Sequence, residues 1–153
     1  MQPGTFDPAL FLNAVINDVS DDKFEAIPAG EYTAVSGECK VSEWQSKDGS
    51  KSGLKITLPW KIDDASLKAT LGRDPSVRQE IMLDITEQNT IATGKGMNIR
   101  LGQLRTALGL NKAGAPFSFN MLSGKPAKIK VKLRQHPDEP DRQLNDVAGV
   151  APL

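Results

Sequence analysis

Hydrophobic and polar residues alternate with a period of two in several segments of this chain. Because successive side chains of a strand point to opposite faces of a sheet, the alternation predicts half-buried β-strands. The segments are residues 31–44, 54–62, 77–85 and 128–134, and a fifth strand is expected over residues 144–153. Residues 45–53, between the first two strands, are rich in Ser, Gly, Asp and Lys, which predicts a long hairpin with a flexible, basic tip.

Two segments have helical spacing instead. The main helix is expected from Ile99 to Leu108, where apolar residues share one side and Gly109 can end the helix. A short helix near the N-terminus is expected after Asp7, a suitable N-cap, with Pro8 at the first helical position. We therefore divide the chain into an N-terminal arm, residues 1–29, and a main domain, residues 30–153.

The predicted order is three strands, one helix and two strands, and this order matches a known β-rich architecture. It is the order of the OB-fold, a five-stranded Greek-key barrel with a helix between strands three and four. In that fold, oligonucleotides lie across strands two and three, between two loops. Here the two loops correspond to residues 45–53 and 135–144.

Charge is unevenly distributed along the chain, although its formal net charge is zero. Residues 1–39 hold seven acidic residues and one lysine, a net charge of −6. Residues 40–134 hold 17 Lys and Arg against eight acidic residues, a net charge of +9. A basic body between acidic ends favours a polyanionic partner such as nucleic acid.

The fourth predicted strand concentrates this positive charge. Residues two apart on a strand lie about 6.6 Å apart on the same side, so its four cations form a line roughly 20 Å long. If the line neutralises four phosphates of a single strand, log K should fall with log salt with a slope near −3. Alternatively, the lysines only protect an edge strand from pairing with another chain. The four cations are Lys128, Lys130, Lys132 and Arg134.

Other strands add cations and aromatic rings. If residues 31–44 form one strand, Thr33 and Val35 face inward while Tyr32 and Trp44 take the solvent phase. An exposed aromatic can stack a base, which contributes about 1–3 kcal/mol regardless of sequence. Trp60, in contrast, shares the inward phase of its strand and is expected in the core. The candidate nucleic-acid-binding residues are Tyr32, Lys40, Trp44, Lys47, Lys51, Lys55, Lys61, Lys128, Lys130, Lys132 and Arg134.

Signatures of catalysis are weak. One histidine, His136, and one cysteine, Cys39, far apart in the sequence, do not form a zinc ligand set. The Asp63-Asp64 pair and Asp84 are the nearest approach to a metal-dependent nuclease, which ranks third among the functional hypotheses. We expect no catalytic residue, metal or cofactor. The sequence has no signal peptide or apolar span, which favours the cytoplasm.

Several blocks together resemble a known family. They are "IPAGEYTAV", "ITLPWKIDD", "VRQEIMLDI", "GKGMNIRLGQLRTALGL", "FSFNMLSGKPAKIKVKLR" and "NDVAGVAPL". In this order they resemble bacteriophage-encoded single-stranded DNA-binding proteins of the OB-fold type. The resemblance implies a replication or recombination protein that coats phage DNA in the cytoplasm of the infected bacterium.

The resemblance also implies phage or host replication and recombination proteins as partners, and it leaves a homo-oligomer open. One departure is the end of the chain, "VAGVAPL", where bacterial single-strand binders carry an acidic tail that recruits partners. The second hypothesis is a non-enzymatic phage protein-protein interaction module, for assembly or recombination, in which the alternating lysines only keep a strand soluble.

Overall fold

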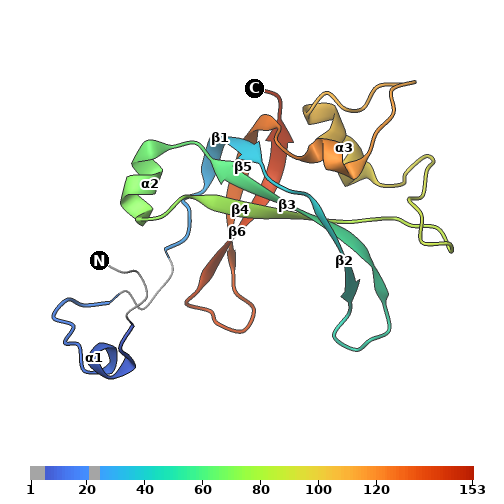
Figure 1. Ribbon diagram of the computed structural model, residues 1–153. Coiled ribbons are helices and arrows are strands. Elements are labelled where there is room, and N and C mark those ends of the chain that lie inside the picture. The colour runs from blue at the N-terminus through green and yellow to red at the C-terminus, as the bar shows by residue number, and fades with distance from the viewer. Residues whose placement is uncertain (1–5, 21–24) are drawn as a thin grey trace.

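The computed structural model describes residues 6–20 and 25–153, and it shows a mainly β protein with few helices (Figure 1). Of the predicted N-terminal arm, residues 1–5 and 21–24 lie outside the described residues. The elements are α1 (Pro8–Leu12), β1 (Gly30–Ser36), β2 (Lys40–Gln45), β3 (Ser52–Ile62), α2 (Ala65–Leu71), β4 (Ser76–Met82), α3 (Ile99–Ala107), the 3-10 helix η1 (Phe119–Leu122), β5 (Pro126–Gln135) and β6 (Gln143–Ala151).

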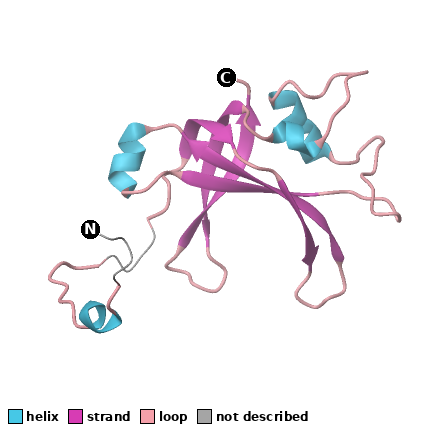
Figure 2. Ribbon diagram, viewed as in Figure 1, coloured by secondary structure: helices cyan, strands magenta, loops and turns pink. Residues whose placement is uncertain are grey.

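The six strands form one antiparallel sheet. Hydrogen bonds connect them in the order β2-β3-β1-β5-β6, and β4 pairs with the other side of β3. β4 and β6 come into contact but do not pair, so the sheet stays open between them. Figure 2 shows the strands as one strongly curved group, with α2 and α3 at its two sides in this view.

The core lies on the inner side of this curved sheet. Alternate residues of β3, including Ile56, Leu58 and Trp60, are fully buried, as are Ile129 and Val131 of β5. The Trp60 indole Nε1 donates to Oε1 of the buried Gln79 at 2.9 Å, which satisfies both polar groups. The predicted core position of Trp60 is therefore confirmed.

The predicted first strand, residues 31–44, is two strands. Ser36 of β1 lies opposite Trp60, and Lys40 of β2 lies opposite Thr57. Residues 37–39 separate the first two, but only residues 58–59 separate their partners on β3, so the segment from β1 to β2 has one extra residue. An extra residue of this kind is a β-bulge, which bends a strand and shifts its phase. It lies beside Pro59, which has no N–H to donate to the neighbouring strand. The five predicted strands thus become six.

The bulge makes the predicted phase wrong for β1. Tyr32, Ala34 and Ser36 take the inward phase, whereas Thr33 and Val35 are exposed. The Tyr32 hydroxyl donates to the Pro28 carbonyl oxygen at 2.6 Å, and its ring packs against the core. Burial, followed by the nearby Asp64 carboxylate, raises the pKa of this phenol. Tyr32 is therefore a partly buried packing residue and not a solvent-phase aromatic.

Side-chain caps begin α1 and α2. The Asp7 side chain accepts from the Ala9 N–H, which confirms the predicted N-terminal helix, and α3 confirms the predicted main helix. α2 was not expected, although Asp64 caps it at one end and Gly72, in the left-handed conformation, ends it. Within the described residues, no helix has the length and apolar character needed to span a membrane.

Candidate nucleic-acid interface

The predicted line of cations on β5 is present. Lys128, Lys130 and Lys132 are exposed, and the residues between them are buried. Leu133, expected to face inward, is 39% exposed because β5 extends beyond the core there. β5 pairs with β1 on one side and with β6 on the other, so protection of an edge strand does not explain its lysines.

Acidic residues of the neighbouring strands interrupt this line. Lys130 lies opposite Glu31 of β1, and Lys132 lies opposite Asp146 of β6. Arg134 Nε forms an ion pair with Asp146 Oδ2 at 2.7 Å. The β5 cations therefore do not form an isolated positive track.

A second group of candidates shares the outward face of β2 and β3. Lys40 and Trp44 of β2 point to this face, and so do Lys55 and Lys61 of β3. Lys55 Nζ is 3.2 Å from Glu80 Oε1 of β4, which reduces the charge it offers. The register of β2 therefore places Lys40 and Trp44 on the predicted side, but Val41, expected to face inward, is 53% exposed and Trp44 is partly buried.

The indole of Trp44 lies against the backbone of Gly53, its partner across the β2–β3 pair. A Cβ atom at position 53 would be 2.8 Å from the indole Nε1, closer than real Cβ contacts. The Nε1 atom is buried there without a hydrogen-bond partner among the described residues. Glycine at position 53 is thus what allows this ring to lie flat on the strand.

The tip of this hairpin carries the exposed Lys47 and Lys51. Asp48 organises the turn between them: its Oδ1 accepts from the Ser46 hydroxyl at 2.7 Å, the Ser50 hydroxyl at 2.7 Å and the Ser50 N–H at 3.0 Å. These hydrogen bonds to the charged form lower the pKa of Asp48 from 3.8 to about 2. The tip is therefore a hydrogen-bonded turn that presents two lysines.

The open side of the sheet forms a cleft of about 680 Å³ between β4 and β6. Sequence reasoning missed it, because it requires strands that are distant in the sequence to meet. Among the cations of the cleft that were not predicted, Arg78 had a visible signal, since it alternates with the buried Val77 and Gln79 on β4. The cations that line the cleft are Arg73, Arg78, Arg100, Lys132, Arg134 and Arg142, of which only Lys132 and Arg134 were predicted.

Positive charge exceeds negative charge in this cleft. Its acidic lining residues are Glu25, Glu80 and Asp146, of which Glu80 is paired with Lys55 and Asp146 with Arg134. In contrast, Arg78, Arg100 and Lys132 form no ion pair with any part of the chain that the structure describes. These three side chains remain available to an anionic ligand.

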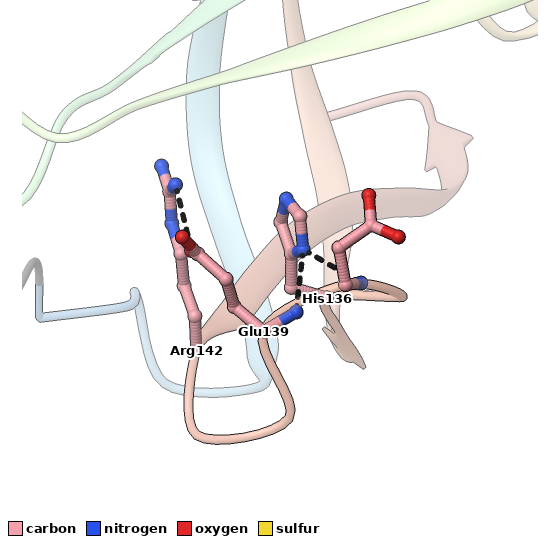
Figure 3. A network of polar contacts seen from close by, with 4 residues as sticks. His136, Glu139 and Arg142 are labelled. Atoms are coloured by element: carbon pink, nitrogen blue, oxygen red, sulfur yellow. Dashed lines mark hydrogen bonds and ion pairs between the residues drawn. The ribbon is translucent and has the colours of Figure 1, made fainter.

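The loop between β5 and β6 borders the cleft and is held by its own polar contacts (Figure 3). His136 Nδ1 accepts from the N–H groups of Asp138 and Glu139, both at 3.1 Å. Glu139 Oε2 is 3.4 Å from Arg142 Nη1, and Arg142 lines the cleft. His136 therefore shapes the loop that carries Arg142.

Two of the acidic residues considered for metal chemistry, Asp64 and Asp84, have structural partners. Asp64 Oδ1 accepts from the Leu67 N–H at 2.9 Å and caps α2. Asp84 Oδ2 accepts from the Asn98 N–H at 2.7 Å, and the Asn98 amide donates to the Asp84 carbonyl oxygen at 2.9 Å. No cluster of three His, Cys, Asp or Glu side chains suited to a metal ion occurs in residues 6–20 and 25–153.

Comparison with known proteins adds no assignment: the sequence matches no protein-family model and no curated protein. The interpretation of this surface therefore rests on its residues and their geometry.

Proposed function

We propose that this protein binds single-stranded DNA without sequence preference, on the outward face of β2, β3 and β4 and in the adjoining cleft. The observation that carries the proposal is the order of side chains across this face. Trp44 lies on β2, Lys55 and Lys61 on β3, and Arg78 on β4, next to the cleft. An aromatic ring and a series of cations thus follow one another across adjacent strands.

This order suits a single strand of nucleic acid. Adjacent strands lie about 4.8 Å apart, so a chain that crosses them meets a new side chain at each step. The indole that rests on Gly53 is partly exposed, and we infer that its free face stacks a base, because every base has a face that stacks. Cations without ion pairs then attract the phosphates, which carry no sequence information. Stacking and phosphate contacts together give affinity without base recognition.

The architecture supports the same proposal. We infer an OB-fold-like barrel in which β1 and β2 together serve as its first strand, and β4 and β6 face each other across the cleft. α3 follows β4 and precedes β5, as the helix of an OB-fold does. The hairpin tip and the loop between β5 and β6 project in the same direction in Figure 1, and in this fold the equivalent loops border the ligand.

Lys128 and Lys130 lie outside the proposed path. They face Ala151 and Gly149 of β6, whereas the residues of β6 that line the cleft are 143–147. Lys132 and Arg134 belong to the path because they reach the cleft. The proposed context is phage DNA replication or recombination in the cytoplasm of an infected bacterium, as the resemblance of the sequence blocks implies.

Fluorescence titration with oligothymidine at several salt concentrations tests the proposal. We expect quenching of tryptophan fluorescence and, if about four phosphates are neutralised, a log-log salt slope near −3. Trp44→Phe should remove most of the quenching, because Trp60 is fully buried. A protein-interaction module would show neither quenching nor salt-dependent affinity. Incubation with magnesium should leave the DNA intact, and cleavage would favour a nuclease instead.

A further inference from the structure

One apolar side chain on the outward face of the sheet belongs neither to the core nor to the path described above. Met82 is the last residue of β4, and among the described residues that line the cleft it is the one large hydrophobic side chain that is exposed, at 52%. The other outward positions of β4 are the polar or charged Ser76, Arg78 and Glu80. An exposed apolar side chain is ordinary by itself, so its place on the surface decides what it can contact.

The register of the sheet relates Met82 to Trp44. Met82 lies directly opposite Lys55 of β3, and Lys55 lies directly opposite Ser42 of β2, two residues from Trp44. The outer strands of such a group of three are about 9.6 Å apart, and the Trp44 indole rests on Gly53 of the strand between them. A single strand that stacks a base on this indole and continues into the cleft therefore passes over Met82.

The surroundings of Met82 suit a base better than a phosphate. Glu80 precedes it by two positions on the same face, and Asp84 follows it by two. These carboxylates have partners, Lys55 and the Asn98 N–H, but their negative charge still disfavours a phosphate directly between them. A base is uncharged, and no aromatic side chain lines the cleft in the part of the chain that the structure describes. The exposed thioether is thus the apolar contact that the cleft offers to a ring.

A cation that can take the phosphate of the same nucleotide lies nearby. The Asn98 side chain, at the N-cap of α3, accepts from the Asp84 N–H at 2.8 Å and donates to the Asp84 carbonyl oxygen at 2.9 Å. These bonds hold the first turn of α3 beside the end of β4. Arg100 belongs to this turn, lines the cleft together with Met82, and forms no ion pair with the residues that the structure describes.

We propose that Met82 and Arg100 form a nucleotide subsite at the end of β4, in which the thioether contacts the face of a base and the guanidinium contacts its phosphate. The subsite rests on the proposed function and adds a second base contact to it. Sulfur is polarisable and attracts an aromatic ring, whichever base provides the ring. The subsite therefore adds affinity without sequence preference and carries the strand from Trp44 into the cleft.

NMR of isotope-labelled methionine methyl groups tests the subsite directly, because a base stacked on the thioether shifts the Met82 methyl resonance through its ring current. During a titration with oligothymidine, we expect this resonance to move and to saturate together with the quenching of tryptophan fluorescence. The Met121 resonance should stay in place, because Met121 does not line the cleft. Binding of oligothymidine without a shift at Met82 would overturn the subsite and leave the proposed function standing, whereas a wild-type protein that does not bind would overturn both.

Two probes separate the base contact from the phosphate contact. Met82→Gln should weaken the binding of oligothymidine roughly 2- to 12-fold, the range for a contact between sulfur and a ring, and should leave the affinity for an abasic strand of the same length unchanged. Arg100→Gln should weaken the binding of both probes, because both carry phosphates. Met82→Leu should bind like the wild type, since it keeps an apolar side chain of similar volume.

Val41→Gln is the matched control for the loss of an exposed apolar side chain. Val41 is 53% exposed, close to the value for Met82, but it lies on the opposite face of β2 and does not line the cleft. It should bind oligothymidine like the wild type. Equal affinities of M82Q and V41Q for oligothymidine, or a loss in M82Q that is the same for both probes, would overturn the subsite.

Discussion

Trp44 illustrates how one neighbour determines what a side chain can do. Its indole is positioned by the absence of a side chain at Gly53, because the strand backbone takes the place of a packing partner. The sequence alone shows an aromatic in a solvent phase but not the surface on which it rests. The structure supplies that surface, and in the proposed function the opposite face of the ring stacks a base.

Gly53→Ala should therefore weaken DNA binding although it leaves Trp44 unchanged. A Cβ atom 2.8 Å from the indole Nε1 forces the ring to move. Loss of one stacked base costs about 1–3 kcal/mol, roughly a 5- to 150-fold loss of affinity. Anisotropy of a labelled oligothymidine measures this loss. Gly149→Ala is the matched control, since a Cβ atom in that strand meets nothing within 4 Å, and equal affinities of the two variants would contradict the stacking role of Trp44.

At the scale of elements, the alternation of residues predicted most strands and the caps predicted two helices. The exception is the predicted first strand, in which the β-bulge between Ser36 and Lys40 reverses the phase of β1. A single uninterrupted phase places Val35 inside and Ser36 outside, and the structure has the reverse. The extra residue lies among residues 37–39, beside Pro59 of the adjacent strand, and Gly37 is the local signal of the bulge, because an isolated glycine inside a strand pattern often marks one.

Ser36→Ala should destabilise the fold, because it removes a buried hydroxyl that bonds two backbone groups on the inner side of β1. Its Oγ donates to the Leu122 carbonyl oxygen at 2.6 Å and accepts from the Lys125 N–H at 2.8 Å. Leaving such buried groups without partners costs about 1–3 kcal/mol. Urea unfolding measures the free energy. Ser42→Ala, on the exposed face of β2, should change it little, and equal unfolding midpoints would contradict the assigned phase.

The hairpin tip should depend on pH through Asp48. Its pKa falls from 3.8 to about 2 in the folded turn, so the turn is stabilised above pH 3.8 and loses this stabilisation as the pH falls toward 2. An NMR titration of the carboxyl group should give a midpoint near 2. Ser46→Ala and Ser50→Ala should each raise the midpoint, because each removes a hydrogen bond to the carboxylate. A wild-type midpoint near 3.8 would show that the turn is not formed.

At the scale of the whole molecule, the sheet determines which cations act together. Sequence reasoning treated Lys128 to Arg134 as one line, but only its end, Lys132 and Arg134, reaches the cleft. The other cations of the cleft come from α3, β4 and the segments before β4 and β6. Such a site could not be predicted from local patterns, because it exists only where β4 and β6 meet without pairing.

The most direct test of the account compares two matched pairs of charge reversals. Arg78→Glu with Lys132→Glu alters two cations of the cleft, whereas Lys128→Glu with Lys130→Glu alters two exposed lysines outside it. Affinity for oligothymidine should fall mainly in the first pair, with the log-log salt slope reduced in magnitude by roughly 1.4, the value for two phosphates. Circular dichroism should show both pairs folded. If the second pair loses as much affinity as the first, or if neither loses any, single-stranded DNA does not follow the path from Trp44 to the cleft.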